Sequence, residues 1–135
     1  MKVLLDTHVW IWWLLGSERL SPRERRSLDQ GAAAGSCHLS AMSLWEAQML
    51  HSKGRLTLDR PFAAWLRQAT APGVVAVLPL DVEVVLALDH LPQSFHADPA
   101  DRLIVATALA HGLPLATHDS AIQATGVIPI WQGKA

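Results

Sequence analysis

Residues 2–15 read KVLLDTHVWIWWLL, and this stretch holds the pattern that decides the fold. The short apolar run Val3–Leu5 has the length and composition of a buried strand, and Asp6 ends it. A helical pattern follows directly over residues 8–15. A strand, an acidic junction and a helix in this order predict one unit of an α/β sheet, with the junction at the carboxyl end of the strand.

The same alternation continues along the chain. Further strands are predicted at His38–Ser40, Val74–Leu78, Leu115–Thr117 and Val127–Ile130. Further helices are predicted at 21–34, 43–53, 61–70, 81–90, 99–111 and 119–124. Strands separated by helices favour an α/β layer fold with a mostly parallel sheet.

Composition limits the class of protein. A chain of 135 residues, half of them apolar, fits one domain over residues 1–135. The net charge of −1 shows no basic excess, so an anionic substrate would need a local basic patch or a bound cation. Cys37 is the only cysteine, which excludes a disulfide framework, and we expect it to be a small strand hydrophobe. The apolar run Val9–Leu15 is too short to cross a membrane, so a cytoplasmic protein is expected.

Four acidic residues stand where a parallel sheet collects its ligands. Two follow predicted strands and two are expected in the first turn of a helix: Asp6, Asp119, Glu46 and Asp101. Each also has a structural interpretation as part of a helix start. Ser43 and Glu46 match a capping box, Asp119 suits an N-cap, and Thr7 suits a cap after a turn at Asp6. Asp101 suits the first turn of a helix that Asp98 would cap, where its charge complements the helix dipole. Caps gather at one edge of such a sheet, so position alone leaves both interpretations open.

Carboxylates that converge repel one another and raise one another's pKa unless a cation compensates their charge. Oxygen ligands without cysteine or well-spaced histidine favour Mg²⁺ or Mn²⁺. An ion of this kind supports hydrolysis of a phosphodiester. The sequence contains no glycine-rich phosphate loop, nucleophile elbow or HExxH motif that would compete with this interpretation.

Other polar residues carry two interpretations each. The acids are flanked by His8, His96 and His118, for which local hydrogen bonding is the commoner role. Two basic patches are either solvated helix faces or phosphate contacts: Arg19, Arg23, Arg25 and Arg26, and Lys53, Arg55 and Arg60. Arg102 is a candidate for local charge pairing or substrate contact.

The order and spacing of four motifs resemble the PIN-domain family, in particular the VapC-type toxins of bacterial toxin–antitoxin pairs. These motifs are LLDTHVWIWW, SAMSLWEAQML, LPQSFHADPADRLIVATAL and GLPLATHD. The resemblance implies a three-layer α/β/α sandwich with a central, mostly parallel sheet. It also implies Mg²⁺-dependent endoribonuclease activity that leaves 5′-phosphate and 3′-hydroxyl ends.

The resemblance also assigns roles to residues. The acidic metal site would be Asp6, Glu46, Asp101 and Asp119, with Asp6 and Asp101 as its surest ligands. Accessory roles fall to Thr7, Asp98, Arg102 and Thr117. The two threonines would hydrogen-bond the carboxylates or a metal-bound water. Asp98 fits both the motif and a helix cap.

The implied partners are an RNA substrate, an antitoxin and a second copy in a homodimer. An amphipathic antitoxin segment would lie in an apolar groove that we place at Trp12, Trp13 and Leu14. A catalytically silent PIN module that binds RNA or a protein is the main alternative. A phosphate enzyme with Asp6 as nucleophile is a third, but it requires a second aspartate where His8 stands.

Overall fold

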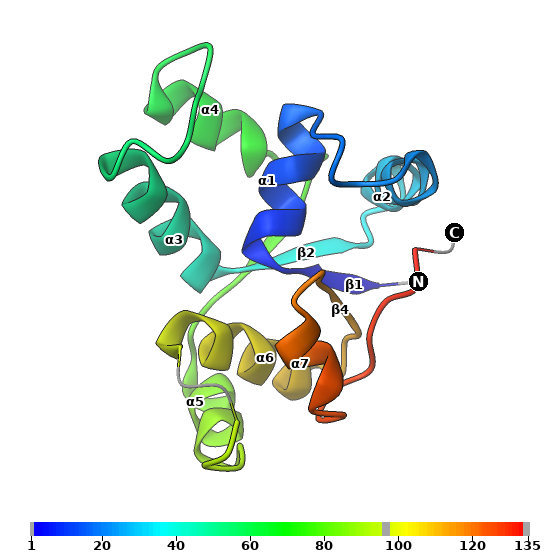
Figure 1. Cartoon of the computed structure of the whole chain (residues 1–135), viewed down its shortest axis with the longest axis vertical. Coiled ribbons are helices and arrows are strands. Elements are labelled where there is room, and N and C mark those ends of the chain that lie inside the picture. Colours follow the sequence, from blue (N-terminus) through cyan, green and yellow to red (C-terminus); the bar gives the residue numbers. More distant parts are fainter. Residues whose placement is uncertain (1, 96–97, 134–135) are drawn as a thin grey trace.

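The computed structural model describes residues 2–95 and 98–133, and in these ranges it forms a parallel sheet between two layers of helices (Figure 1). The strands are β1 (Val3–Leu5), β2 (Cys37–Ser40), β3 (Ala76–Leu78) and β4 (Leu115–Ala116), in the spatial order β3-β2-β1-β4. The helices are α1 (Thr7–Leu15), α2 (Pro22–Ala33), α3 (Ala41–Ser52), α4 (Phe62–Ala69), α5 (Val82–Asp89), α6 (Pro99–His111) and α7 (Ser120–Ala124). The predicted helices are confirmed to within two residues at each end.

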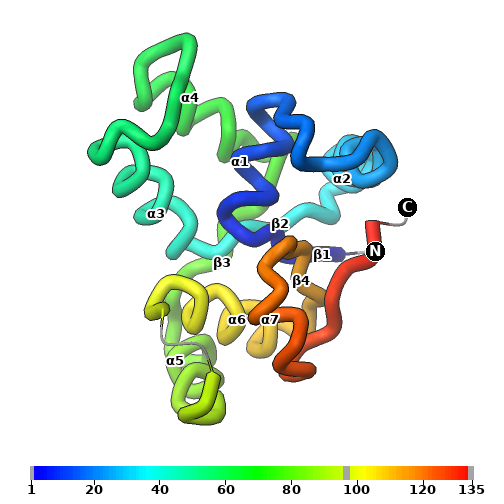
Figure 2. Tube along the Cα trace, viewed as in Figure 1, coloured from blue at the N-terminus to red at the C-terminus, as the bar shows by residue number. Residues whose placement is uncertain are grey.

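Each face of the sheet carries its own hydrophobic core. Helices α1 to α4 lie on one side of the sheet and α5 to α7 on the other, as the chain trace also shows (Figure 2). Strand β1 contributes side chains to both cores: Val3 and Leu5 pack on the α1 side, and Leu4 packs on the α6 side. This alternation is the period of two expected of a strand buried on both faces. The predicted three-layer α/β/α sandwich is therefore confirmed.

Strand β1 occupies the middle of the sheet. Leu4 pairs with His38 of β2 on one side and with Leu115 of β4 on the other, and all pairings are parallel. The carboxyl ends of the strands therefore lie at one edge, where Asp6, Ser40 and Thr117 leave the sheet.

Local sequence signals explain where helix α6 begins and ends. Asp98 is its N-cap, Pro99 occupies its first position, and Gly112 ends it with a positive φ of 64°. The helix between these residues is largely buried against α5 and α3. The charge of its N-cap Asp98 reaches Glu46, which bonds Thr7 directly after β1, so the N-terminus of α6 lies at the same sheet edge as the end of β1.

The predicted fifth strand, Val127–Ile130, is wrong. In the described residues this segment makes only an isolated bridge between Ile130 and Leu115. The Leu115 N–H donates to the carbonyl of Pro129, and the Trp131 N–H donates to the carbonyl of Leu115. The next bond of such a ladder would need an N–H at residue 129, which proline lacks.

Strand β3 is shorter than predicted. Val74 and Val75 both donate their N–H groups to the carbonyl of Ala71, so they close a turn rather than extend the strand. Cys37 lies buried in β2, as expected of a small hydrophobe. None of the helices in the described ranges has the length and apolar character needed to cross a membrane.

Candidate active site

Asp6 and Asp119 leave adjacent strands at the same sheet edge. Asp6 follows β1 and is the N-cap of α1, and Asp119 follows the end of β4 and is the N-cap of α7. The Asp119 side chain accepts the N–H groups of Ala121 and Ile122. The cap predicted at Asp119 is therefore present. The cap predicted at Thr7 is not, because Asp6 takes that position and Thr7 is the first helical residue.

Asp6 is a buried carboxylate whose two oxygens are both held. Only 6% of the residue is exposed. Its Oδ1 accepts the N–H of Thr7 at 2.8 Å, and its Oδ2 accepts the hydroxyl of Thr117 at 2.7 Å. Burial raises the pKa of Asp6 above its ordinary value; the hydrogen bonds from Thr117 and Thr7 counteract this, and the nearby Asp119 charge adds to it.

Glu46 is tied to the same helix start through Thr7. The Thr7 hydroxyl donates to Oε1 of Glu46 at 2.5 Å and lies 2.8 Å from the hydroxyl of Ser43. Thr7 has one hydroxyl proton, which goes to Glu46, so Ser43 is the donor to Thr7. Burial raises the pKa of Glu46, and the charges of Asp6 and Asp98 raise it further against the hydrogen bond from Thr7.

The predicted capping box at Ser43 and Glu46 is wrong. Helix α3 begins at Ala41, and its N-cap is Ser40, whose hydroxyl accepts the N–H of Met42. Glu46 is therefore in the second turn of the helix rather than the first. Because Ser43 and Glu46 are three residues apart, both side chains lie on the helix face that meets Thr7.

Helix α6 brings Asp98 and Asp101 to this edge of the sheet. Asp98 caps the helix through Oδ1, which accepts the N–H groups of Ala100 and Asp101. Its charge also acts on Glu46. Asp101 is half-buried in the first turn, as predicted. Electrostatic interactions thus connect Asp6 with Asp119, and Glu46 with Asp6 and Asp98.

The residues present fit a hard divalent cation. Burial raises the pKa of Asp6 and of Glu46, which means that their charged forms are disfavoured. In the described part of the chain, no lysine or arginine pairs with either carboxylate to offset this. A divalent cation would compensate this buried charge, and an all-oxygen donor set favours Mg²⁺ or Mn²⁺. Within the same ranges, no three acidic, histidine or cysteine side chains form a ready-made metal cluster. Water or substrate oxygens would therefore have to complete the coordination, as is usual for Mg²⁺.

The flanking residues differ in what they contact. The Nε2–H of His118 donates to the Glu24 carboxylate at 2.6 Å across 94 positions of sequence, a contact that no local motif could indicate. Arg102 donates to the carbonyl of Phe95 and lies over its ring, so its contact in the described residues is not with a carboxylate. His96 lies outside the described residues.

Two further residues contact the residues of the sheet edge, Ser43 and Glu24, and no sequence pattern marks either for this role. The pattern around Ser43 indicates a cap, and only the position of α3 against α1 shows that Ser43 supports Thr7. Glu24 belongs to a capping box with Ser21, which is visible in sequence, but its second oxygen reaches His118.

The groove predicted at Trp12, Trp13 and Leu14 needs correction. Trp13 is buried in the core of the α1 side, with 8% of it exposed, and its Nε1 donates to Asp29. It therefore offers almost no surface to a partner. Trp12 and Leu14 are half-buried. Trp10, one helical turn before Trp13, is buried on the same inner face of α1.

Comparison with known proteins points to one family. The family model described as the PIN domain matches residues 3–128. A protein named ribonuclease VapC22, from Mycobacterium tuberculosis, is 38% identical over 118 residues, which are 87% of this chain and 86% of that protein.

Solved structures share the fold at low identity. A chain of the VapBC2 complex from Rickettsia felis, solved with a DNA fragment from its promoter, superposes with a TM-score of 0.73 at 14% identity, covering 97% of this chain and 98% of that one. A chain of FitAcB from Neisseria gonorrhoeae gives a TM-score of 0.66 at 22% identity and 97% coverage of both chains. These likenesses show the fold.

Proposed function

The chain belongs to the PIN-domain family as a ribonuclease toxin of the VapC type, and from this premise we propose that it cleaves RNA at the acidic sheet edge. The carboxylates that would hold the metal are Asp6, Glu46, Asp101 and Asp119. The observation that carries this proposal is the pair of buried Asp6 and half-buried Glu46, both with raised pKa values and without a pairing lysine or arginine in the described residues. Such a pair is costly to a fold unless a cation compensates it.

Thr7 links the buried carboxylate of Asp6 to the half-buried carboxylate of Glu46. Its N–H donates to Asp6 and its hydroxyl donates to Glu46, so the start of α1 sets the positions of both. Thr117 performs a similar role from β4: its hydroxyl accepts the Asp119 N–H and donates to Asp6. Through these bonds the carboxylates are oriented before any ligand arrives.

We assign Mg²⁺ as the resident metal, with Mn²⁺ as a substitute. When bound, the ion would supply charge neutralisation at the phosphodiester and a water that ionises more easily. The protein's own contribution is to hold the carboxylates in place and to bury one of them, Asp6, away from water. The products expected are 5′-phosphate and 3′-hydroxyl ends.

The proposed partners follow from the family. An antitoxin partner is supported by structural neighbours that are toxin–antitoxin complexes, among them one from Klebsiella pneumoniae. We further propose that the protein acts on RNA as a homodimer, that it is cytoplasmic, and that residues 1–135 form one domain.

A cleavage assay on purified protein tests the proposal. Wild type should cut RNA with Mg²⁺ and lose this activity in EDTA, and Asp101→Asn should abolish it while the protein stays folded. Asp59→Asn is the matched control, because Asp59 lies on the surface, paired with Arg60. A fully active Asp101→Asn would refute the assigned site. RNA binding without metal-dependent turnover in the wild type would instead indicate a catalytically silent binding module.

A further inference from the structure

Trp12 holds one cation, the guanidinium of Arg19, next to the acidic sheet edge. We propose that Arg19, held over the indole of Trp12, binds a phosphate of the RNA strand and so positions the strand for cleavage. This inference rests on the proposed function, because RNA is the substrate assigned there. Arg19 is a positioning residue in this proposal, and Trp12 is its support.

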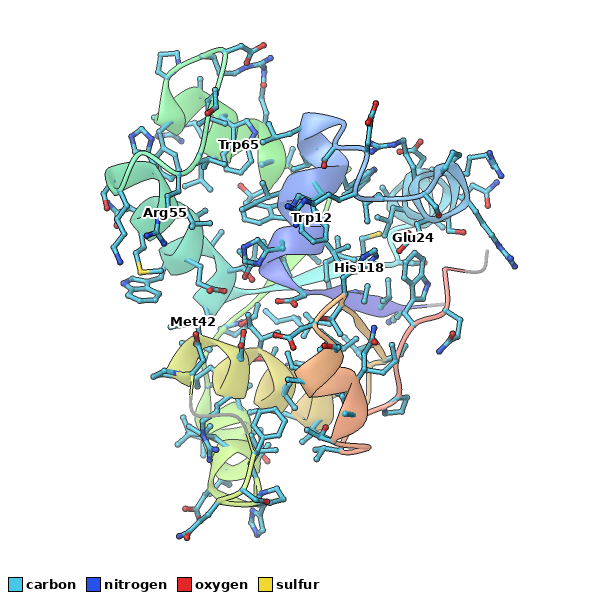
Figure 3. All side chains as sticks on the ribbon, viewed as in Figure 1. Trp12, Glu24, Met42, Arg55, Trp65 and His118 are labelled. Carbon is cyan, nitrogen blue, oxygen red and sulfur yellow. The ribbon has the colours of Figure 1, made fainter. Side chains whose placement is uncertain are left out.

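The aromatic contacts connect Trp12 to the acidic site from two elements. On α1, the ring of His8 lies 5.8 Å from the ring of Trp12, and His8 follows Asp6 by two residues. From the end of β4, the ring of His118 meets Trp12 edge-on at 5.4 Å, and His118 directly precedes Asp119. Figure 3 shows His118 between Trp12 on α1 and Glu24 on α2.

The distance from the site suits a neighbouring phosphate. Trp12 lies six residues beyond the N-cap Asp6, which is roughly 9 Å along the axis of a helix. The guanidinium carbon of Arg19 lies over Trp12, 5.3 Å from the ring centroid. An RNA strand that is cleaved at the acidic sheet edge would therefore run past Arg19, close to the phosphate that reacts.

Contacts separate Arg19 from the other arginines of its patch. Arg25 donates to the carbonyls of Trp13 and Ser17, so it joins the end of α1 to α2. The Arg19 guanidinium pairs with none of the carboxylates in the described residues, and its contact there is the Trp12 ring. Stacking fixes the plane of a guanidinium and leaves its N–H edge available, which suits bidentate binding of phosphate.

The surroundings of Trp12 favour a polyanion over an apolar peptide. Two histidines and an arginine contact the indole, whereas an apolar peptide would be matched by aliphatic neighbours. A chain with a net charge of −1 and a cluster of carboxylates also needs a local cation to hold RNA. Beyond His118, a pocket of about 590 Å³ has a mixed lining, with Gln123 and Gln132 beside Glu24, Ile130 and Trp131.

Binding of a short single-stranded RNA, measured by fluorescence anisotropy in EDTA across a salt series, tests the inference without turnover. Arg19→Ala should weaken binding about fivefold to tenfold and reduce the slope of log affinity against log salt by about 0.7, the value for one phosphate contact on a single strand. Trp12→Leu should weaken binding less, because the guanidinium loses its support but keeps its charge. In cleavage assays with Mg²⁺, Arg19→Ala should raise KM and leave kcat near the wild-type value.

Arg23→Ala is the matched control, since Arg23 is an exposed arginine of the same patch. Arg19→Lys should restore the salt slope but only part of the affinity. If Arg19→Ala and Trp12→Leu match Arg23→Ala in affinity and slope, the proposal is overturned. It is also overturned if both variants weaken antitoxin binding and leave RNA binding intact. Trp12→Phe replaces Trp12→Leu if thermal unfolding shows that the latter is not folded.

Failure of the proposed function would look different. Wild type would then show no Mg²⁺-dependent cleavage, and Asp6→Asn would change nothing. The anisotropy series in EDTA would still report whether Arg19 contributes one phosphate contact to RNA binding.

Discussion

Helices α1 and α6 begin in the same way, but their capping aspartates have different surroundings and different expected roles. Each has an aspartate N-cap whose side chain accepts an N–H of its own helix, Asp6 in α1 and Asp98 in α6. Asp98 is exposed, whereas Asp6 is buried and also accepts the hydroxyl of Thr117. The same local signal therefore produces a helix start in one place and a desolvated carboxylate in the other. Burial, which the cap pattern does not encode, makes the difference.

The largest expected effect is on catalysis. Asp6→Asn should reduce RNA cleavage by about 1,000-fold or more, because it removes charge from the proposed metal site, a loss of about 4 kcal/mol in transition-state stabilisation. Asp98→Asn should stay within a few-fold of wild type, because asparagine caps a helix as well as aspartate does. Initial rates at saturating Mg²⁺ measure both. Equal losses in the two variants would break the contrast between the two caps.

A second, smaller effect concerns the hydroxyl of Thr7, which lies beside the buried cap Asp6. Thr7→Val should lower kcat/KM by about 10- to 100-fold, since Glu46 loses a hydrogen bond and Ser43 loses its acceptor. Thr7→Ser should recover most of this activity. Thr70→Val is the control, because the Thr70 hydroxyl bonds a carbonyl at the end of α4. An active Thr7→Val would mean that the hydroxyl does not orient the carboxylate.

The exposed cap should matter for stability rather than for chemistry. Asp98→Ala should lower the free energy of unfolding by about 1 kcal/mol, because two N–H groups at the start of α6 lose their acceptor. Asp98→Ser should restore it to within a few tenths of a kcal/mol. Urea unfolding at pH 7 in EDTA makes the comparison. No loss in Asp98→Ala would show that solvent replaces the cap.

The smallest expected effect is a dependence of stability on pH. Because the pKa of Asp6 is raised, its folded state binds a proton more tightly than its unfolded state, so this residue favours folding at low pH. Its contribution is lost as pH rises above the ordinary value of 3.8 and through the raised pKa. In EDTA, the wild type should therefore lose stability relative to Asp6→Asn as pH rises toward 7, and Asp98→Asn should follow the wild type. Parallel curves for all three proteins would contradict the burial argument.

The sequence predicted what is local and periodic. Asp98, Pro99 and Gly112 set the bounds of α6 through capping and φ preferences that act within a few residues. The order of strands and helices along the chain was enough to predict the three layers. The predicted start of α3 lies two residues too late, because both Ser40 and Ser43 suit an N-cap. The packing of Ser43 against Thr7 decides between them.

Long-range contacts could not be predicted in the same way. The Glu24–His118 contact joins residues 94 apart, and no periodicity or cap marks it. Likewise, the burial of Trp13 and the half-exposure of Trp12 depend on where α2 and the end of β4 lie against α1. The positions of Asp6 and Asp119 followed from the rule for parallel strands, but the raised pKa values followed only from the packed structure.

The central place of β1 has a consequence for synthesis on the ribosome. Strand β1 is translated before both of its neighbours: it pairs on one side with β2, but its other side must wait for β4, and the Asp6–Thr117 hydrogen bond spans 111 positions. Nascent chains that end before Thr117 have neither this bond nor Asp119. The proposed site can therefore be completed only after β4 has been made and has paired with β1.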